Sequence, residues 1–394
     1  MASTLAPAEA ELLKRVEALS DSFDPQAVEE YVRMFSRVIA EQTGRWTARE
    51  LEERYRRIRQ PRRFRQTETI HTVFVLSRVT LGADVAVTSV LLDAARRRFP
   101  HARISLVGGR KNHELFAGEP RIGWTPLDYG RTAPLAARLA AGLALREALA
   151  EPGAIVLDPD SRLTQLGLLP VCDEDAYYFF ESRTAGGEGF EPLAVLARRW
   201  ADETFSIPDA GPWLAPEGES TETPAITVSL GVGENPGKRL PDPFEAELLA
   251  GLARLGTPLL VDTGAGGEEA ERVERAVRQA GLPSSQVRLF QGAFSGFALS
   301  IARSRLYVGY DSAGQHAAAA LGVPVLTIFA GFPCERFYWR WQPWGPGPKI
   351  TIRVDPGADV QRVLDETLDA ARRLLSHPAQ VSSTGMTRTN SAIT

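Results

Sequence analysis

A short polar segment, DSAGQH (residues 311–316), could bind an anion at the start of a helix. An apolar run leads into it and an Ala-rich run follows, so Asp311 and Ser312 stand where a strand passes into a helix. Such a helix start exposes unpaired N–H groups and partial positive charge, which suit an anion. Ser312 and His316 are four residues apart and share a helix face. A lone histidine is more often structural there, but its alignment with Asp311 favours a functional role.

The loop SRVTLGADVAVTS (residues 77–89) joins the first predicted strand to its helix. Gly82 allows a close approach of the backbone, and Asp84 lies at or just before the helix start. Two interpretations of Asp84 stay open: an N-cap that accepts from free backbone N–H groups, or a general base that faces a cleft. The pattern G-x-G-x-x-G is absent, so the loop does not predict a dinucleotide site.

The segment SLGVGENPGKRLPDPFEAE (residues 229–247) follows the first strand of a second series. Gly233 adds flexibility to the loop, and Lys238 and Arg239 bring positive charge close to a helix start. A Walker A loop needs a set glycine spacing and a Ser or Thr after its lysine. Here the spacing differs and Arg239 takes the hydroxyl position, so we exclude an NTPase P-loop. A cation at this edge of a sheet can still bind a phosphate.

Two further segments carry weaker signals. Glu268 opens a helix after a Gly-rich turn, where an acidic residue is an ordinary partner of the helix dipole but could also hold ribose hydroxyls. The aromatic segment FPCERFYWRWQPWGPGP (residues 332–348) predicts either buried packing or stacking on a nucleotide base or sugar. Neither pattern decides between its two interpretations.

Strands and helices alternate through most of the chain, which predicts two doubly wound α/β domains. The first series begins at TVFVLS (residues 72–77), and the second runs from AITVSLGV (residues 225–232) to a final helix at residues 360–375. Residues 206–224 are rich in Pro, Gly, Glu and Thr and predict the linker. The C-terminal ends of the two parallel sheets would then face a cleft, where ligands bind in such folds.

Residues 8–60 predict an N-terminal helical extension, because apolar positions recur there at helical spacing. The extension leads into a basic run, RYRRIRQPRRFR (residues 54–65). Such a run is usually a solvated helix face followed by a linker, and the alternative is contact with an anionic partner such as a membrane surface.

Composition narrows the class of protein. The chain has 394 residues, of which 44% are hydrophobic and 24% charged, as in globular proteins. Its net charge of −4 provides no basic field for nucleic acid. Two cysteines, Cys172 and Cys334, cannot build a disulfide framework or a metal cluster. The sequence shows neither a secretory-signal pattern nor an uncharged apolar run long enough for a bilayer, so we expect a soluble cytoplasmic protein.

Four separated motifs resemble those of the heptosyltransferases, glycosyltransferase family 9. DSAGQHAAAALGVPVLTIF is similar to the family pattern D-[ST]-G-x-x-H-x-A-A-A-L-G-x-P, and FSGFALSIARSRLYVGYDS to the helix and strand before it. GENPGKRLP resembles the family's Gly-rich loop with its lysine. SRVTLGADVAVTSVLLDAARRRFPHARISLVGG resembles the N-terminal block R-x-x-x-x-G-D-x-x-x-x-x-P-x-x-x-x-x-R-x-x-F-P. The resemblance covers residues 71 to about 375.

The resemblance implies a GT-B fold and metal-independent, inverting transfer of a sugar, typically heptose from ADP-heptose, to a lipopolysaccharide-type or other glycan acceptor. It implies that Asp84 is the catalytic base and that Lys238 contacts the donor phosphates. The implied donor-binding set is completed by Arg239, Asp311, Ser312, Ala313, Gly314 and His316, with Gly82, Gly233 and Glu268 as further candidates. No cofactor is implied, because the nucleotide sugar is a substrate.

Three positions depart from the family patterns: Ala83 and Ala313 stand in place of glycine, and Ser89 in place of proline. The predicted organisation is a helical extension (1–66), an acceptor domain (67–215), a donor domain (216–380) and a disordered tail (381–394). A UDP- or GDP-sugar enzyme and a non-catalytic nucleotide-sugar-binding protein are the alternatives. The predicted partners are the nucleotide sugar, a glycan or glycolipid acceptor and, as an alternative for the basic run, the inner membrane face.

Overall fold

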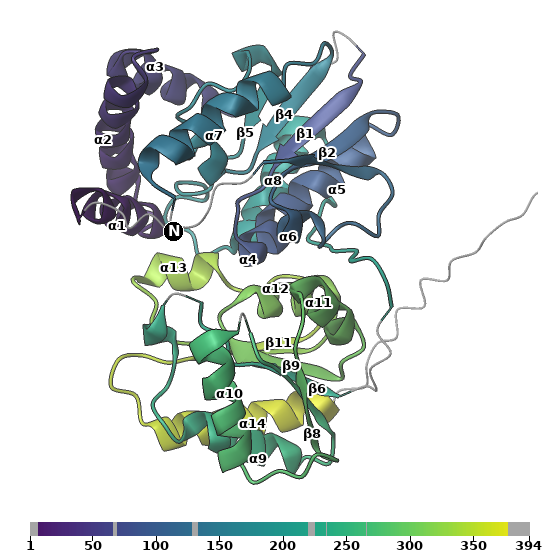
Figure 1. The fold of residues 1–394 in the computed structure, drawn as a ribbon. Helices are drawn as coiled ribbons and strands as arrows, with labels where there is room; N and C mark the ends of the chain where they lie inside the picture. The colour runs from purple at the N-terminus through teal and green to yellow at the C-terminus, as the bar shows by residue number, and fades with distance from the viewer. Residues whose placement is uncertain are drawn as a thin grey trace, which may run out of the picture.

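The computed structural model describes residues 7–65, 69–127, 133–219, 225–233, 235–264 and 266–376. Within these ranges the chain forms two α/β domains, one above the other in Figure 1, with a group of N-terminal helices on the side of the first domain. The predicted boundaries at 66/67 and 380/381, and the predicted tail, lie outside the described residues.

The first domain is built on a parallel sheet of five strands in the order β3-β2-β1-β4-β5. Its strands are β1 (Thr72–Leu76), β2 (Arg103–Gly108), β3 (Ile122–Pro126), β4 (Ala154–Asp158) and β5 (Tyr177–Phe179). Its helices are α4 (Leu81–Ala83), the π-helix η1 (Asp84–Thr88), α5 (Ser89–Arg98), α6 (Arg110–His113), α7 (Leu135–Ala148), the 3-10 turns η2 (Arg162–Thr164) and η3 (Glu174–Ala176), and α8 (Leu193–Phe205).

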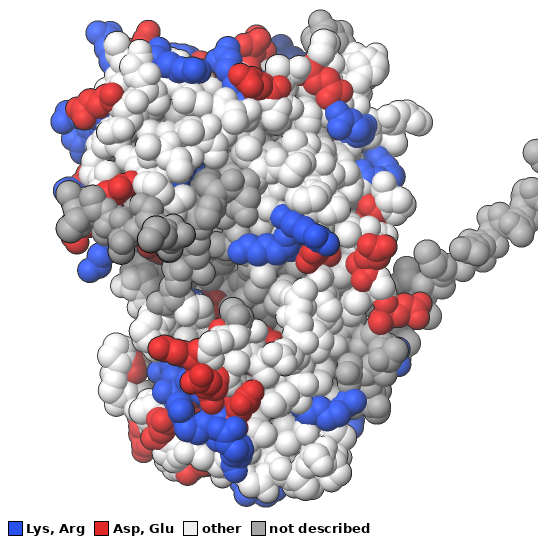
Figure 2. Space-filling view, in the orientation of Figure 1, with Lys and Arg blue, Asp and Glu red and all other residues white. Residues whose placement is uncertain are grey.

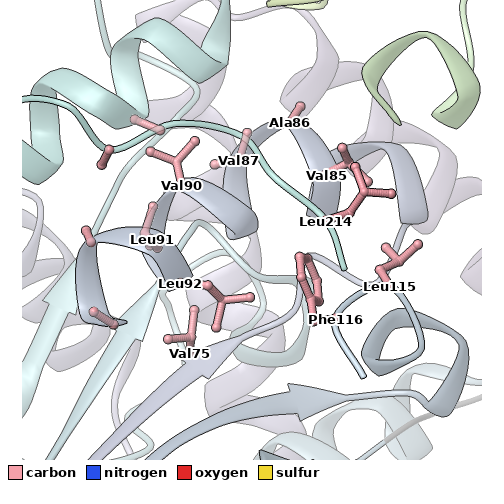
Figure 3. Close-up of a cluster of buried hydrophobic side chains, with 14 of the residues drawn as sticks. Val75, Val85, Ala86, Val87, Val90, Leu91, Leu92, Leu115, Phe116 and Leu214 are labelled. Carbon is pink, nitrogen blue, oxygen red and sulfur yellow. The ribbon is translucent and has the colours of Figure 1, made fainter. Parts of the chain in front are cut away.

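Alternate residues of the central strand β1 face opposite sides of this sheet, as strand geometry requires. Val73 and Val75 belong to the hydrophobic cluster with α5 and α8, and Figure 3 shows Val75 beside side chains of α5. Phe74 and Leu76 belong to a second hydrophobic cluster, which includes residues of α7 and of the N-terminal helices. Both faces of β1 are therefore buried, which explains its continuous apolar sequence.

The second domain has a parallel sheet of six strands in the order β11-β10-β9-β6-β7-β8. Its strands are β6 (Ile226–Ser229), β7 (Leu259–Asp262), β8 (Val287–Phe290), β9 (Leu306–Tyr310), β10 (Val325–Phe329) and β11 (Lys349–Arg353). Its helices are the 3-10 turn η4 (Pro236–Lys238), α9 (Phe244–Ala253), α10 (Gly267–Gln279), α11 (Phe294–Ala302), α12 (Ala313–Ala320), α13 (Glu335–Arg340) and α14 (Val360–Ser376).

The predicted N-terminal extension is helical, as α1 (Pro7–Asp21), α2 (Pro25–Thr43) and α3 (Ala48–Ile58). Asp24 caps α2 by accepting from the N–H groups of Gln26 and Ala27, and Pro25 occupies the first helical position. The buried face of α2 joins the core of the first domain, and the hydroxyl of Tyr31 donates to Gln165 O at 2.7 Å. The extension is therefore packed onto the first domain.

The basic run is largely used inside the protein. Arg54 is buried and donates to Gly167 O at 2.7 Å, and Arg57 forms an ion pair with Glu174 at 2.7 Å. Arg62 donates to Tyr177 O at 3.1 Å. These three arginines therefore make contacts within the protein that neither predicted interpretation of the run described, and contact with a membrane stays a prediction.

The first part of the predicted linker is fastened to the first domain. The indole N–H of Trp213 donates to Ser89 O at 2.9 Å, and Ala215 N donates to Leu115 O at 2.8 Å. Leu214 lies beside Leu115 in the buried cluster of Figure 3. Residues 220–224 lie outside the described ranges.

Charged side chains of both signs are interspersed on the face shown in Figure 2, in keeping with 45 Lys and Arg against 49 Asp and Glu. No helix in the described ranges combines the length and apolar character needed to cross a membrane.

Candidate active site

The start of α12 lies at the C-terminal edge of the second sheet, directly after β9. Ser312 occupies the N-cap position with an extended backbone, although its side chain makes no capping hydrogen bond. Gly314 is packed so closely that a Cβ atom on it would lie 2.1 Å from the hydroxyl oxygen of Tyr307. Only glycine therefore fits this turn while Tyr307 keeps its buried place.

Lys238 and Asp311 come together at this edge. The Nζ atom of Lys238 is 2.6 Å from Asp311 Oδ2 and 3.1 Å from Asp311 O. Gln315 donates to the other carboxylate oxygen of Asp311 and accepts from Thr327 Oγ1 at 2.8 Å. Asp311 thus holds the lysine ammonium in front of α12, and the lysine charge is compensated in this conformation.

His316 is buried in α12, with 5% of its surface exposed. Its ring packs edge-on against Trp341, with the centroids 5.9 Å apart. Burial lowers the pKa of its imidazole to about 4, although the charge of Asp311 acts in the opposite direction. The ring is therefore neutral at pH 7 and serves as a packed polar group at the base of the site.

Asp84 differs from the expectation of a carboxylate that faces the cleft. It has no exposed surface. Its oxygens accept from Ser77 Oγ at 2.6 Å, Arg78 N at 2.7 Å, Thr88 Oγ1 at 2.6 Å and Asn112 Nδ2 at 2.6 Å. A carboxylate offers about four acceptor positions, so these four donors occupy all of them.

The expectation of a cleft-facing Asp84 is therefore wrong in this structure, for a physical reason. The loop after β1 folds back over the carboxylate, and Asn112 at the end of α6 closes it from the other side. Burial raises the pKa of Asp84, and the hydrogen bonds from Ser77, Thr88 and Arg78 N oppose that shift. The N-cap interpretation of Asp84 is wrong as well, because the helix begins at Leu81 with Thr80 at the N-cap position, and Asp84 lies after its first turn. In this geometry Asp84 fixes the loop after β1 through Arg78 N.

Gly82 brings the two domains into contact. A Cβ atom on Gly82 would lie 3.3 Å from Ala313 Cα and 3.5 Å from a ring carbon of His316. Helix α4 therefore packs directly on the first turn of α12, as Figure 1 also shows. The predicted residues Gly82, Ala313 and His316 meet at this contact.

Three other predicted residues lie apart from this group. Arg239 turns away from Lys238 and pairs with Asp242 and with Glu245, the latter at 3.1 Å. Gly233 is exposed in its loop with a φ of 60°, and Glu268 is exposed in the first turn of α10. The structure thus separates Arg239, Gly233 and Glu268 from the Lys238–Asp311 pair.

A cavity of about 70 Å³ lies between the domains, beside the α4–α12 contact. The first domain supplies Arg78 and Arg162 to its wall, and the second domain supplies Trp341. The end of α1 supplies Asp21, and the turn after it supplies Phe23. The N-terminal extension therefore reaches the interdomain site, which no local sequence pattern indicated.

The aromatic segment 332–348 is used for packing at this junction. Phe337 packs edge-on against Phe23, with centroids 6.2 Å apart, and Trp341 packs against His316. The packing interpretation of this segment is thus confirmed for these two rings. Gln315 was missed by sequence reasoning, because it occupies a variable position of the motif; its neighbours Asp311 and His316 were the only signal for it.

No group of three or more His, Cys, Asp or Glu side chains suited to a metal ion occurs in the described part of the chain.

The two-domain architecture matches solved glycosyltransferases of the GT-B fold. A glycosyl transferase family 9 protein from Veillonella parvula has a TM-score of 0.57 at 16% identity, covering 78% of this chain and 98% of that one. ADP-heptose LPS heptosyltransferase II from Escherichia coli has a TM-score of 0.52 at 20% identity, covering 77% and 98%. Heptosyltransferase WaaC from E. coli, solved with ADP, has a TM-score of 0.56 at 16% identity, covering 77% and 98%.

These matches confirm the predicted GT-B fold and extend the resemblance to glycosyltransferase family 9 from motifs to three-dimensional structure. At such identities the likeness concerns the fold. No protein-family model matches the sequence, and the search of curated proteins finds no match.

Proposed function

We propose that this protein is an inverting glycosyltransferase that moves a sugar from a nucleoside-diphosphate donor, with ADP-heptose as the first candidate, to a lipopolysaccharide-type or other glycan acceptor. The observation that carries the proposal is the Lys238–Asp311 pair in front of the α12 N-terminus, at the junction of two domains with a GT-B arrangement. An ammonium group and a helix start suit a diphosphate.

The leaving diphosphate gains negative charge as the bond to the sugar breaks. Preorganised positive groups lower the barrier of such a step. Lys238 and the first N–H groups of α12 would receive this charge, while Asp311 and Gln315 hold the lysine in place. No step in this scheme requires a metal ion.

Substrate entry requires the domains to separate, because a cavity of about 70 Å³ is much smaller than the hundreds of Å³ typical of small-molecule sites. Closure then excludes water from the reacting centre and protects the donor from hydrolysis. The packing of Gly82 on Ala313 is the contact that such an opening would break.

Binding of nucleotides tests the proposal. A thermal-shift panel of ADP, UDP, GDP and their sugars should show stabilisation by one nucleotide series, and the preferred base separates ADP-heptose from a UDP- or GDP-sugar donor. Lys238→Ala should weaken binding of that diphosphate by about 1–3 kcal/mol, or roughly 5- to 150-fold in Kd. Arg239→Ala is the matched control, since Arg239 is directed toward Glu245. Equal affinity of the Lys238→Ala variant and the wild type would remove Lys238 from the site.

A non-catalytic nucleotide-sugar-binding protein is a second candidate, favoured by the saturated hydrogen bonding of Asp84. Turnover distinguishes the two. An enzyme incubated with the preferred nucleotide sugar and a glycan acceptor releases free nucleoside diphosphate, whereas a binding protein protects the donor without releasing product.

A further inference from the structure

We propose that Asp21, the last residue of α1 and part of the wall of the interdomain cavity, is the catalytic base that takes the proton of the acceptor hydroxyl. This inference rests on the proposed glycosyl transfer. It assigns the base to the N-terminal extension, which lies outside the part of the chain that resembles the family.

The turn that directly follows Asp21 is held in a defined place between the domains. The Sγ atom of Cys334 is 3.4 Å from Ser22 O, and Arg336 donates to Phe23 O at 3.0 Å. Figure 1 shows α13, from which Arg336 comes, next to the end of α1. The turn is therefore anchored by the second domain.

Phe23 adds evidence that this placement is specified. Its φ of 52° lies in the left-handed region, which costs a residue other than glycine about 1–2 kcal/mol. Phe23 is only 4% exposed and packs on Phe337. A strained residue persists where surrounding contacts outweigh the strain, and such residues cluster at functional sites.

The carboxylate of Asp21 keeps its acceptor capacity. The side chain is half-buried and lines the cavity. Within the described ranges it makes no hydrogen bond or ion pair, in contrast to Asp84 with its four donors. Of these two carboxylates, only that of Asp21 can accept a proton from a molecule that enters the cavity.

The cavity wall has further unused polar atoms. Asp160 Oδ1, Arg183 Nη1 and Trp341 Nε1 are buried without a hydrogen-bond partner in the described part of the chain. All three residues line the same cavity. Buried polar atoms are usually paired, so this wall has capacity for hydroxyl groups of an acceptor.

The charges around Asp21 suit a base. Burial raises the pKa of its carboxyl group, and the charge of Glu17 on the same helix acts in the same direction. Arg162, Lys238 and Arg78 oppose the shift and keep the ionised form accessible. Asp160 and Arg183, which pair at 3.1 Å, also line the cavity. A base is most effective when its pKa approaches the working pH.

The influence of Lys238 on Asp21 also links the two halves of the reaction. In the step, an acceptor oxygen forms a bond to the anomeric carbon as its proton passes to Asp21. The bond from that carbon to the β-phosphate oxygen breaks, and the nucleoside diphosphate leaves with the electron pair toward Lys238. Donor and acceptor thus become glycoside and nucleoside diphosphate, with one proton held on Asp21.

The test compares Asp21→Asn with Asp24→Asn in full-length protein. Both variants replace an acid by its amide, one at each end of the turn between α1 and α2. Asparagine caps a helix as well as aspartate does, so α2 keeps its N-cap in the control. We measure kcat, the pH profile of kcat/KM and the Kd of the preferred nucleoside diphosphate. Asp21→Ala is assayed with added formate, which can replace a missing carboxylate.

We expect Asp21→Asn to lower kcat by about 10²-fold or more, to lose the acidic limb of the pH profile and to bind the nucleoside diphosphate with unchanged affinity. Formate should restore part of the turnover of Asp21→Ala. If Asp21→Asn retains the rate and acidic limb of Asp24→Asn, Asp21 is not the base. If the wild type transfers no sugar from any donor, the proposed function fails, and the role of Asp21 fails with it.

Discussion

Replacing His316 by glutamine should make the free energy of unfolding less dependent on pH between pH 7 and pH 4. Burial lowers the pKa of His316 to about 4 in the folded protein, against an ordinary value of 6.5. Between these pH values the unfolded chain binds the proton more tightly than the folded one. The contribution of His316 to stability is therefore complete above pH 6.5 and is lost as the pH falls toward 4.

The magnitude follows from the separation of the two pKa values. Each pKa unit corresponds to about 1.4 kcal/mol, so the free energy of unfolding should fall by about 3 kcal/mol between pH 7 and pH 4 through this residue alone. The buried carboxyl of Asp158 acts in the opposite direction, because burial raises its pKa to about 6. Its contribution is present at low pH and is lost as the pH rises toward 6. The wild-type curve alone therefore does not isolate His316.

A difference between variants does isolate it. Urea unfolding of wild type, His316→Gln and the control His101→Gln should be measured at pH 4, 5, 6 and 7, following the transition of the second domain. His101 is exposed in the first domain, so its replacement provides the matched background. The loss between pH 7 and pH 4 should be about 3 kcal/mol smaller in His316→Gln than in wild type or control.

Parallel pH curves for wild type and His316→Gln would refute the assignment of His316 as a neutral, buried ring. A direct check is the imidazole titration by NMR. If the His316 resonance titrates near pH 6.5 in the folded protein, the ring is not buried against Trp341 as the structure shows.

Two further predictions concern glycines at the site. Gly82→Val should separate the domains, because even a Cβ atom there comes within 3.3 Å of Ala313 Cα; small-angle scattering should show a larger radius of gyration, and an unchanged radius would contradict the contact. Gly314→Ala should lower the free energy of unfolding by about 1–3 kcal/mol, since its Cβ would collide with Tyr307; a urea midpoint equal to that of wild type would show that Tyr307 can move aside.

The central strands of both sheets were predictable because they are buried on both faces and read as apolar runs. The edge strand β8 was also predictable, but the edge strands β3, β5 and β11 were not. β3 has the sequence IGWTP, with exposed residues along most of its length, and β5 has only three residues. β11, KITIR, is mostly half-buried. Edge strands lack the apolar pattern because one side or one face remains open.

The meeting of Lys238 and Asp311 was predictable in outline. Lys238 follows β6 and Asp311 follows β9, and these strands pair in parallel, so both residues emerge at the same edge of the sheet. The saturation of Asp84 was not predictable in the same way. One of its donors, Asn112, lies 28 positions away on α6, and no motif connects the two residues.

The place of the extension could not be predicted from local patterns at all, since Cys334 meets Ser22 across 312 positions of sequence. The position of the extension also determines which carboxylate is affected when the domains close around the nucleotide sugar. The donors to Asp84 are Ser77, Arg78, Thr88 and Asn112, which all belong to the first domain.

Opening the domains would therefore leave the hydrogen bonds of Asp84 in place. Asp21 differs, because residues of the second domain act on it: Lys238 lowers the pKa of its carboxyl group, Cys334 and Arg336 hold its turn, and Trp341 lines the same cavity. Domain closure around a nucleotide sugar changes the surroundings of Asp21. It leaves the hydrogen bonds to Asp84 unchanged. The position of Asp21 suits a base that becomes active only when the nucleotide sugar is enclosed. Proton removal then coincides with the exclusion of water.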